Sequence, residues 1–269
     1  MATRQEVTVA VLGCGTVGTS VVQLLEATAS DLQARIGVPI RVVGIAVQDL
    51  SRDRPGIDPA LLTDNAVDLA TSGADIVVEV MGGIEPARSL VVAAMEAGSS
   101  VVTANKALLA HDGAALYAAA HRSEVDLYFE ASVAGAIPLL RPLRESLVGD
   151  RISKVMGIVN GTTNYMLTKM DEQGVDYASV LAEADALGYL EADPTLDIDG
   201  HDAAAKAAII AELAFHSRVT LEDVHVEGIS GVTASDMAAA RQMGFTIKLL
   251  AIAEDRKSTR LNSSHQIIS

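Results

Sequence analysis

The feature that most constrains the fold is a glycine-rich turn between a buried-strand pattern and a helix pattern near the N-terminus. Residues 7–13 read VTVAVLG, a run of β-forming residues that ends in glycine, and residues 16–33 then show apolar residues at helical spacing. The turn, GCGTVG, matches the G-x-G-x-x-G pattern with which a parallel sheet binds a dinucleotide. We therefore expect Gly13 to permit a tight turn, Gly15 to admit a pyrophosphate, and Gly18 to let helix and strand pack closely.

Strand and helix patterns alternate through the rest of the first half. The further strand patterns are IRVVGIAV (40–47), ADIVVEVMG (74–82), SVVTANKA (100–107) and VDLYFEASV (125–133). A helix pattern between the third and fourth strands has proline near its start and glycine just after its end. Repeated β-α-β units predict an α/β fold, a Rossmann-type doubly wound parallel sheet over residues 1–134.

The alternation changes after residue 135, where helices begin to predominate. Strand patterns at 152–161, 224–232 and 244–254 enclose helix patterns at 161–170, 176–188 and 202–217. These predict a second, α+β domain over residues 135–255.

Residues 256–269, RKSTRLNSSHQIIS, are polar, basic and serine-rich directly after an apolar strand pattern. We predict that this segment is foreign, similar to translated sequencing-adaptor read-through, and that the native reading frame stops near Asp255. The alternative is a flexible native tail.

Composition excludes several classes of function. A net charge of −15 repels nucleic-acid backbones, and 3% aromatic residues leaves few side chains to stack on bases. No apolar run reaches the ~18 residues of a membrane span. The single cysteine, Cys14, favours a reducing cytoplasm, and we read it as a small residue that fits the turn.

The most unusual segment is GYLEADPTLDIDGHDAAAK, residues 188–206, in which five carboxylates precede one lysine. Gly200 fits the sixth position of a calcium loop, but Thr195 and Lys206 stand where acidic ligands are required, so we reject a calcium site. Asp202 and Lys206 could form an ordinary i,i+4 ion pair on a solvated helix face. The alternative is half of an active site, since the alanines around the lysine would let a ligand approach.

Five segments together resemble the homoserine dehydrogenase family. They are GCGTVG, VTANKALL (102–109), EASVAGAIP (130–138), NGTTNYML (160–167) and the acidic segment above. The resemblance runs from about residue 6 to residue 255, and its two second-domain motifs are more specific than the glycine turn. It implies NAD(P)-dependent interconversion of L-aspartate 4-semialdehyde and L-homoserine, a step of threonine and methionine biosynthesis, on a small amino-acid substrate.

The resemblance also implies roles for individual residues. The catalytic lysines would be Lys206 and Lys106, and the substrate would contact Glu191, Asp202, Asp197 and Thr162. The cofactor would contact Gly13, Gly15, Thr16, Val17, Gly18, Thr103, Lys106 and Gly188. A monovalent cation, Na⁺, would bind Glu130 and the carbonyls of Val133, Gly135 and Ile137.

Several of these roles have plainer alternatives. Thr162 could cap a helix, and the other acidic residues of the 188–206 segment are read mainly as solvated turn residues, with Asp197 the expected exception. The second strand ends without the acid that NAD-specific sites carry and has Arg52 and Arg54 nearby, which slightly favours NADP over NAD. Glu79 lies in a strand pattern without an assigned role.

The chain lacks a Gly-Pro-Gly-rich segment that follows in the family, and a C-terminal regulatory domain. The family dimerises through its second domain, so we expect a homodimer for the full-length protein. Another Rossmann oxidoreductase of an amino-acid-derived substrate, and a non-catalytic nucleotide-binding module, remain alternative interpretations.

Overall fold

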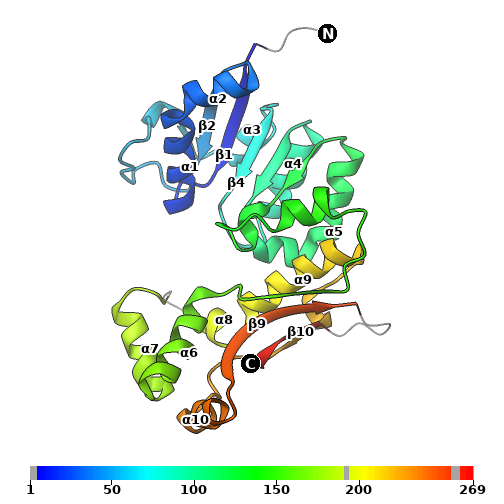
Figure 1. Ribbon diagram of the computed structural model, residues 1–269. Coiled ribbons are helices and arrows are strands. Elements are labelled where there is room, and N and C mark those ends of the chain that lie inside the picture. Colours follow the sequence, from blue (N-terminus) through cyan, green and yellow to red (C-terminus); the bar gives the residue numbers. More distant parts are fainter. Residues whose placement is uncertain (1–4, 191–193, 256–260, 269) are drawn as a thin grey trace. The chain divides into compact units, whose positions relative to one another are not determined.

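The structure is a computed structural model that describes residues 5–190, 194–255 and 261–268, the last segment by its backbone only. The chain divides into two compact units, Met1–Ala136 and Ile137–Ser269. Each unit has a sheet of its own (Figure 1).

Unit 1 contains a six-stranded sheet in the order β3-β2-β1-β4-β5-β6, with every neighbouring pair parallel. The strands are β1 (Val7–Leu12), β2 (Ile40–Ala46), β3 (Leu62–Thr63), β4 (Ile76–Glu79), β5 (Ser100–Thr103) and β6 (Leu127–Tyr128). The order reverses direction between β1 and β4, which is the switch point where doubly wound sheets bind ligands. The predicted Rossmann-type fold is confirmed.

Helices cover both faces of this sheet. They are α1 (Thr16–Ala27), α2 (Ala29–Ile36), α3 (Ala66–Ala70), α4 (Ala87–Glu96) and α5 (Lys106–Arg122), with 3₁₀ turns at Pro59–Leu61 and Glu130–Ser132. Three predicted strands are too long, since the strand predicted at 74–82 is limited to β4 and those at 100–107 and 125–133 also end early. β5 ends at Thr103 because Asn105 caps α5, its side chain accepting a hydrogen bond from the Leu108 amide. β6 is only two residues long, because the chain then enters the 3₁₀ turn.

Unit 2 contains a mixed sheet in the order β7-β9-β10-β8. Its strands are β7 (Lys154–Gly157), β8 (Val224–Val226), β9 (Thr246–Glu254) and β10 (Leu261–Ile268). Its helices are α6 (Gly161–Gln173), α7 (Tyr177–Ala186), α8 (Thr195–Ile198), α9 (His201–Phe215) and α10 (Ala234–Gln242), with a π-helical turn at Pro142–Ser146 and a 3₁₀ turn at Leu221–Asp223. The second, α+β domain is therefore present.

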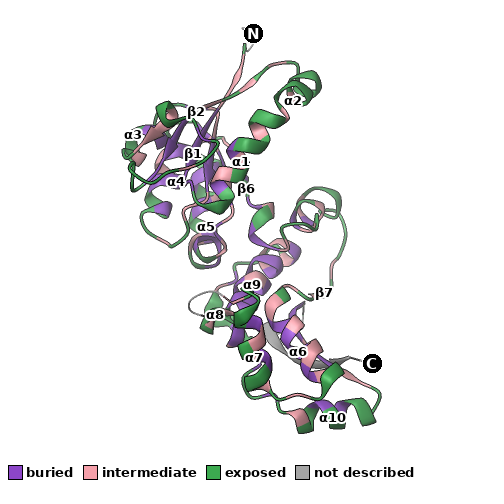
Figure 2. Cartoon of the chain, turned by 90° about the vertical axis from the view of Figure 1, so that its left-hand side faces the viewer, coloured by how far each residue is buried: buried purple, intermediate pink, exposed green. Residues whose placement is uncertain are grey.

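Helix α9 is the buried centre of unit 2, and it appears largely purple in Figure 2. It packs against β8 and β9, and its alanines are buried. Small side chains let this helix pack closely on several sides, and whether they also admit a ligand beside Lys206 stays a prediction.

Unit 2 contains two helices that the sequence analysis did not predict. α8 is only four residues long, within the segment expected to be a loop. α10 begins at a capping box in which Thr233 and Asp236 bond each other's backbone amides. This capping signal is readable in the sequence. The strand predicted at 224–232 is shorter than expected and ends at Val226.

Residues 261–268, set apart as a tail in the sequence analysis, form β10 in the structure. This strand pairs antiparallel with β9 and parallel with β8. The backbone of this segment therefore adopts a paired strand, while the foreign origin of its sequence stays a prediction.

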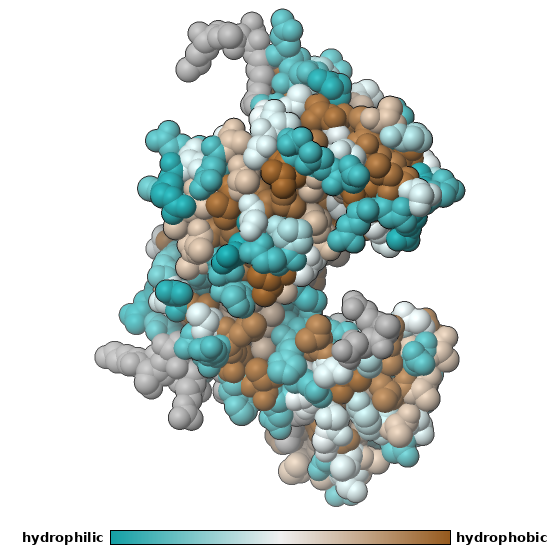
Figure 3. Space-filling view, turned by 180° about the vertical axis from the view of Figure 1, so that it is seen from behind, coloured by the Kyte–Doolittle hydropathy of each residue, from teal (hydrophilic) through white to brown (hydrophobic). Residues whose placement is uncertain are grey.

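On the face shown in Figure 3, hydrophilic and apolar residues are interspersed over both units. No helix in the described part of the chain combines the length and apolar character needed to cross a bilayer.

Candidate functional site

The glycine turn of unit 1 joins the end of β1 to the start of α1. Gly13 has φ +104°, a left-handed conformation that favours glycine. A Cβ added at Gly18 would lie 2.1 Å from the Gly13 carbonyl oxygen, so helix and strand approach as closely as expected. A Cβ at Gly15 would meet nothing within 4 Å, which leaves open space beside the backbone where a phosphate is expected. Thr16 and Val17 form the exposed first turn of α1.

A cavity of about 580 Å³ opens beside this turn. Its lining comes from the glycine turn, the end of β2 and the loop after β4, and comprises Gly13, Cys14, Gly15, Ala46, Val47, Gln48, Asp49, Arg52, Arg54, Asp64, Ala66, Val80, Met81 and Pro86. Such a cavity at the carboxyl ends of parallel strands suits a nucleotide.

The loop after β2 carries three of the charged side chains of this cavity, Asp49, Arg52 and Arg54. The Arg54 Nη1 donates to the carbonyl oxygens of Asp49 and Arg52, both at 2.9 Å, and its Nε donates to the Cys14 carbonyl at 3.4 Å. Arg54 therefore ties this loop to the glycine turn. The Ser51 hydroxyl and amide donate to the Asp49 carboxylate and lower its pKa.

Glu79, which sequence reasoning could not place, is a buried anchor at the end of β4. Its carboxylate accepts hydrogen bonds from the Met81 amide at 2.8 Å and from the Thr103 hydroxyl at 2.6 Å. Asn105 continues the connection, since its Nδ2 donates to the Gly83 carbonyl at 2.6 Å. The network fixes the end of β5 where α5 begins at Lys106, so Lys106 starts from a rigid support.

In unit 2, Lys206 is half-buried, and its partner Asp202 is buried. Its Nζ lies 2.7 Å from Asp202 Oδ2 and donates to the Val159 carbonyl at 2.6 Å. The side chains of Lys206 and Asp202 are 15% and 2% exposed. The pair is an i,i+4 pair, as expected, but the interpretation as an ordinary pair on a solvated helix face is wrong.

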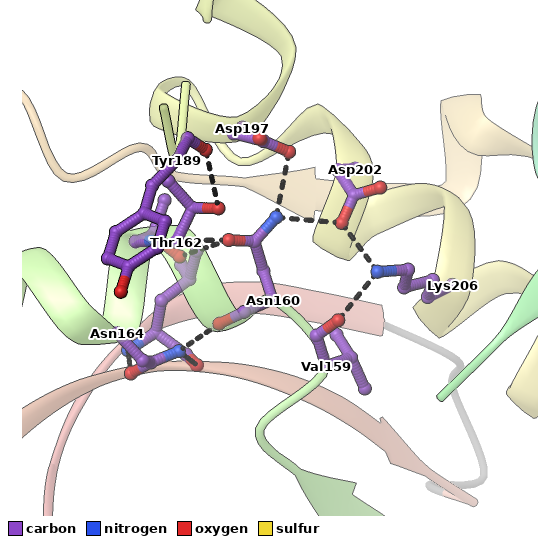
Figure 4. Close-up of polar contacts among 10 residues, drawn as sticks. Val159, Asn160, Thr162, Asn164, Tyr189, Asp197, Asp202 and Lys206 are labelled. Atoms are coloured by element: carbon purple, nitrogen blue, oxygen red, sulfur yellow. Dashed lines mark hydrogen bonds and ion pairs between the residues drawn. The ribbon is translucent and has the colours of Figure 1, made fainter. Parts of the chain in front are cut away.

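Asn160 connects this pair to the acidic segment (Figure 4). Its Nδ2 donates to Asp197 Oδ1 at 2.8 Å and to Asp202 Oδ2 at 2.9 Å. Asn160 is the first residue of the NGTTNYML motif, and the sequence alone assigned it no role. Asp197, expected to be the exception among solvated acids, does bond another side chain of the site.

Thr162 does not cap α6, because Asn160 is the capping residue and accepts a hydrogen bond from the Thr163 amide at 2.9 Å. Thr162 instead donates its hydroxyl to the Tyr189 carbonyl at 3.3 Å. Gly188, at φ +72°, follows the end of α7, where a left-handed residue is common. The start of the acidic segment is thereby attached to α6.

The remainder of the acidic segment is held by close backbone contacts. A Cβ at Gly200 would lie 2.9 Å from the Glu227 carbonyl oxygen, and a Cβ at Gly228 would lie 2.5 Å from the Ile198 carbonyl oxygen. The Ile229 amide donates to the same Ile198 carbonyl at 2.8 Å. Glu191, the other expected substrate-binding acid, lies outside the described residues.

The expected cation-binding residues follow β6. Glu130 is half-buried in the 3₁₀ turn, Val133 is buried, and Gly135 is exposed. Ala134 between them has φ +52°, so the backbone is irregular here. Ile137 belongs to unit 2 and is 60% exposed.

Comparison with known proteins identifies the family. Residues 13–130 match the model for the homoserine dehydrogenase NAD binding domain, and residues 138–268 match the model for homoserine dehydrogenase. The chain belongs to the homoserine dehydrogenase family. It is 60% identical over 247 residues to the homoserine dehydrogenase of Corynebacterium glutamicum, an alignment that covers 91% of the chain and 56% of that protein.

Solved structures agree with this assignment. A homoserine dehydrogenase from Thiobacillus denitrificans has a TM-score of 0.92 at 42% identity, covering 98% of this chain and 62% of that one. A hyperthermophilic archaeal homoserine dehydrogenase in complex with NADPH has a TM-score of 0.81 at 25% identity, covering 98% and 83%. The chain spans a little over half the length of the curated relatives it matches, 56% and 57% for the first two.

Proposed function

We propose that this chain carries the catalytic residues of a homoserine dehydrogenase, which interconverts L-homoserine and L-aspartate 4-semialdehyde. Homoserine and NAD(P)⁺ would give the semialdehyde, NAD(P)H and a proton. The observation that carries the proposal is the half-buried Lys206 ammonium group, which lies against Asp202 Oδ2 and donates to the Val159 carbonyl. An ammonium group has three N–H donors, and we assign the third to a substrate oxygen.

Lys206 has the chemistry that this reaction needs. When bound, the nicotinamide cofactor supplies or accepts the hydride. The substrate oxygen gains negative charge in the reduction direction, and an ammonium group can stabilise that charge and donate a proton. In the oxidation direction the neutral amine form of Lys206 would accept the hydroxyl proton, directly or through water, and so return to the ammonium form. Asp202 and Val159 would hold the ammonium in one orientation for both steps.

We assign the cofactor to unit 1. The open space beside Gly15, the left-handed Gly13 and the close Gly13–Gly18 contact fit a pyrophosphate on the N-terminus of α1, with Thr16 and Val17 in its first turn. The NADPH complex of the archaeal relative agrees with a nicotinamide dinucleotide.

We further propose that NADP is favoured over NAD. Gln48 follows the second strand where NAD-specific sites carry an acid, and Arg52 and Arg54 line the cavity. A guanidinium group binds the additional phosphate of NADP, whereas a carboxylate at the same place would repel it.

The substrate is assigned to unit 2. Its ammonium group would be bound by the carboxylates of Glu191, Asp202 and Asp197, and its carboxylate by a donor at Thr162. Asp202 Oδ2 also accepts from Asn160 and lies 2.7 Å from Lys206 Nζ, so Asp202 would contact both the lysine and the substrate.

The remaining assignments rest on the family resemblance and the local geometry. Lys106 would be the second active-site lysine, with Thr103 and Gly188 as further cofactor contacts. Thr103 donates its hydroxyl to Glu79, so its side chain also supports the loop that precedes Lys106. Na⁺ would bind the Glu130 carboxylate and the carbonyls of Val133 and Gly135, hard oxygen ligands on irregular backbone; the assignment of Ile137 stays a prediction.

For the full-length protein we propose a cytoplasmic homodimer without nucleic-acid partners. β7 is an edge strand, and Met156 on it is 51% exposed and the following Ile158 50% exposed, an apolar edge available for pairing. The net charge of −15 argues against nucleic-acid partners, and the single cysteine favours a cytoplasmic location.

The proposal is tested by following reduced nicotinamide absorbance with homoserine and either NADP⁺ or NAD⁺. The 269-residue chain should be assayed beside the same chain extended by the C-terminal part of the Corynebacterium glutamicum relative. We expect homoserine-dependent reduction in the extended chain, faster with NADP⁺ at low concentration. If both chains bind NADPH but neither turns over homoserine, the chain is a nucleotide-binding module and the proposal is wrong.

A further inference from the structure

The side-chain amide of Asn160 uses its full hydrogen-bonding capacity inside unit 2. Its Oδ1 accepts from the Thr163 amide at 2.9 Å and from the Thr163 hydroxyl at 2.8 Å. Its Nδ2 donates to Asp197 and Asp202. Turning the amide over would place a carbonyl oxygen against two carboxylates and an NH₂ group against an N–H, so only one orientation is possible.

The two carboxylates that meet at this NH₂ group have the same charge. Asp202 is 4% exposed and Asn160 is 6% exposed, while Asp197 is half-buried, so solvent reaches this interaction mainly from the Asp197 side. The amide donor and the Lys206 ammonium together offset the repulsion between the acids. Removing the amide would take away a donor that contacts both carboxylates.

The same oxygen atom links Asn160 to the lysine. Asp202 Oδ2 accepts from Asn160 at 2.9 Å and lies 2.7 Å from Lys206 Nζ. A rotation of the Asp202 carboxylate would therefore break both contacts together. Val159, whose carbonyl is the other acceptor of Lys206, precedes Asn160 in the chain, so one backbone segment supports both sides of the ammonium.

We propose that Asn160 is a positioning residue for the reaction: it holds Asp197 and Asp202 together, and through Asp202 it fixes the Lys206 ammonium for proton transfer. This inference rests on the proposed function, because the proton transfer is the step that Lys206 is proposed to perform. A purely structural alternative exists, since Asn160 also caps α6.

Three substitutions separate positioning from capping. Asn160→Ser keeps a capping oxygen but removes the NH₂ donor. Asn160→Asp keeps the shape and the capping oxygen, removes the donor and adds a third negative charge. Asn65→Ser is the matched control, because Asn65 caps α3 in unit 1 by accepting from the Asp68 amide.

In the extended chain, we expect Asn160→Ser to lower kcat for homoserine oxidation about ten- to hundredfold, with NADPH binding unchanged. Asn160→Asp should lower kcat further. It should also shift the acidic limb of the pH–rate profile to higher pH, because the added carboxylate raises the pKa of neighbouring groups. Asn65→Ser should leave kcat and the profile unchanged. If Asn160→Ser lowers only the unfolding temperature, as the control does, Asn160 is a structural cap and the inference is wrong.

A second measurement does not depend on turnover. The rate of reductive methylation at Lys206, measured by mass spectrometry on the 269-residue chain, reports how firmly the ammonium is held. It should rise severalfold in Asn160→Ser and stay constant in Asn65→Ser. An unchanged methylation rate would overturn the positioning role even if the enzyme is active. A chain inactive on homoserine whose methylation rate rises would instead count against the proposed function, with the positioning of Lys206 intact.

Discussion

The glycine turn of unit 1 and the Lys206 network of unit 2 are built in different ways. In the turn, the proposed cofactor binding depends on absent side chains: Gly15 leaves space beside the backbone, and Gly18 lets α1 approach β1. In the network, the proposed proton transfer depends on side chains that hold one another, from Asn160 through Asp202 to Lys206. A backbone site is a local property of a few consecutive residues, whereas a side-chain network depends on residues far apart in the sequence. The two sites should therefore fail differently when they are altered.

The largest expected effect is in the network. Lys206→Ala removes the proposed proton donor, and kcat for homoserine oxidation by the extended chain should fall about 10²- to 10⁴-fold, with NADPH affinity retained. Lys169→Ala is the control, since Lys169 is also partly buried and paired, with Glu183 at 3.0 Å. A Lys206→Ala enzyme with normal kcat would refute the catalytic assignment of this lysine.

The glycine turn offers a pair of substitutions that should differ in kind. Gly18→Ala places a Cβ against the Gly13 carbonyl, so it should lower the free energy of unfolding by about 1–3 kcal/mol and weaken NADPH binding as well. Gly15→Ala meets no protein atom, so stability should be unchanged while NADPH affinity falls about tenfold. Denaturant unfolding and a fluorescence titration of NADPH check both. Equal NADPH affinity in Gly15→Ala and the parent would show that the phosphate binds elsewhere.

A smaller effect is expected at the rim of the cavity. Arg52→Ala should weaken NADPH binding about tenfold and leave NADH binding unchanged, because only NADPH carries the additional phosphate. Arg54 is a poorer choice for this test, since its guanidinium also holds the loop to Cys14. Parallel titrations with the two cofactors measure the ratio, and an equal loss for both would argue against Arg52 as the source of the preference.

The smallest expected effect lies on α9, farther along the helix from Lys206. Burial raises the pKa of Glu212, and Arg218 only partly opposes the shift. A carboxyl group with a raised folded-state pKa stabilises the protein below its ordinary pKa, and that contribution is lost as pH rises through the folded-state value. Glu212→Gln should therefore raise the unfolding temperature at neutral pH by about one or two degrees.

The gain from Glu212→Gln should vanish below the ordinary pKa of glutamate, where the parent side chain is also neutral. Thermal unfolding of both proteins at neutral and acidic pH measures the difference. A gain of equal size at both pH values would mean that the charge of Glu212 has no part in it. A gain confined to neutral pH would show that the charge of the half-buried Glu212 is costly, in contrast to that of Asp202, which Lys206 and Asn160 stabilise on the same helix.

The contrast between the two sites also explains how much the sequence could predict. The Rossmann sheet, the glycine turn and the Asp202–Lys206 pair follow from short-range spacing, and all three are present. Asn160 and Glu79 could not be given roles, because their partners are distant: 37 and 42 residues separate Asn160 from its two acids, and 24 separate Glu79 from Thr103. No periodic pattern reports such contacts.

Burial was the other property that the sequence did not reveal. The alanines near Lys206 suggested room for a ligand, and the structure shows in addition that they are buried on a helix that packs against the sheet of unit 2. The same composition is compatible with an open or a closed helix face. Only the tertiary packing, here α9 against β8 and β9, decides between them.

Gly228 has a consequence for genetics. Its backbone lies so close to Ile198 and Asp199 that any side chain would displace them, and Asp197 with them. A screen for inactive variants should therefore recover substitutions at Gly228 as readily as substitutions in the Lys206 network, although this residue has no functional group to lose. A map of how well each position tolerates substitution would show low tolerance where two backbone segments touch, and would mark these positions as part of the site.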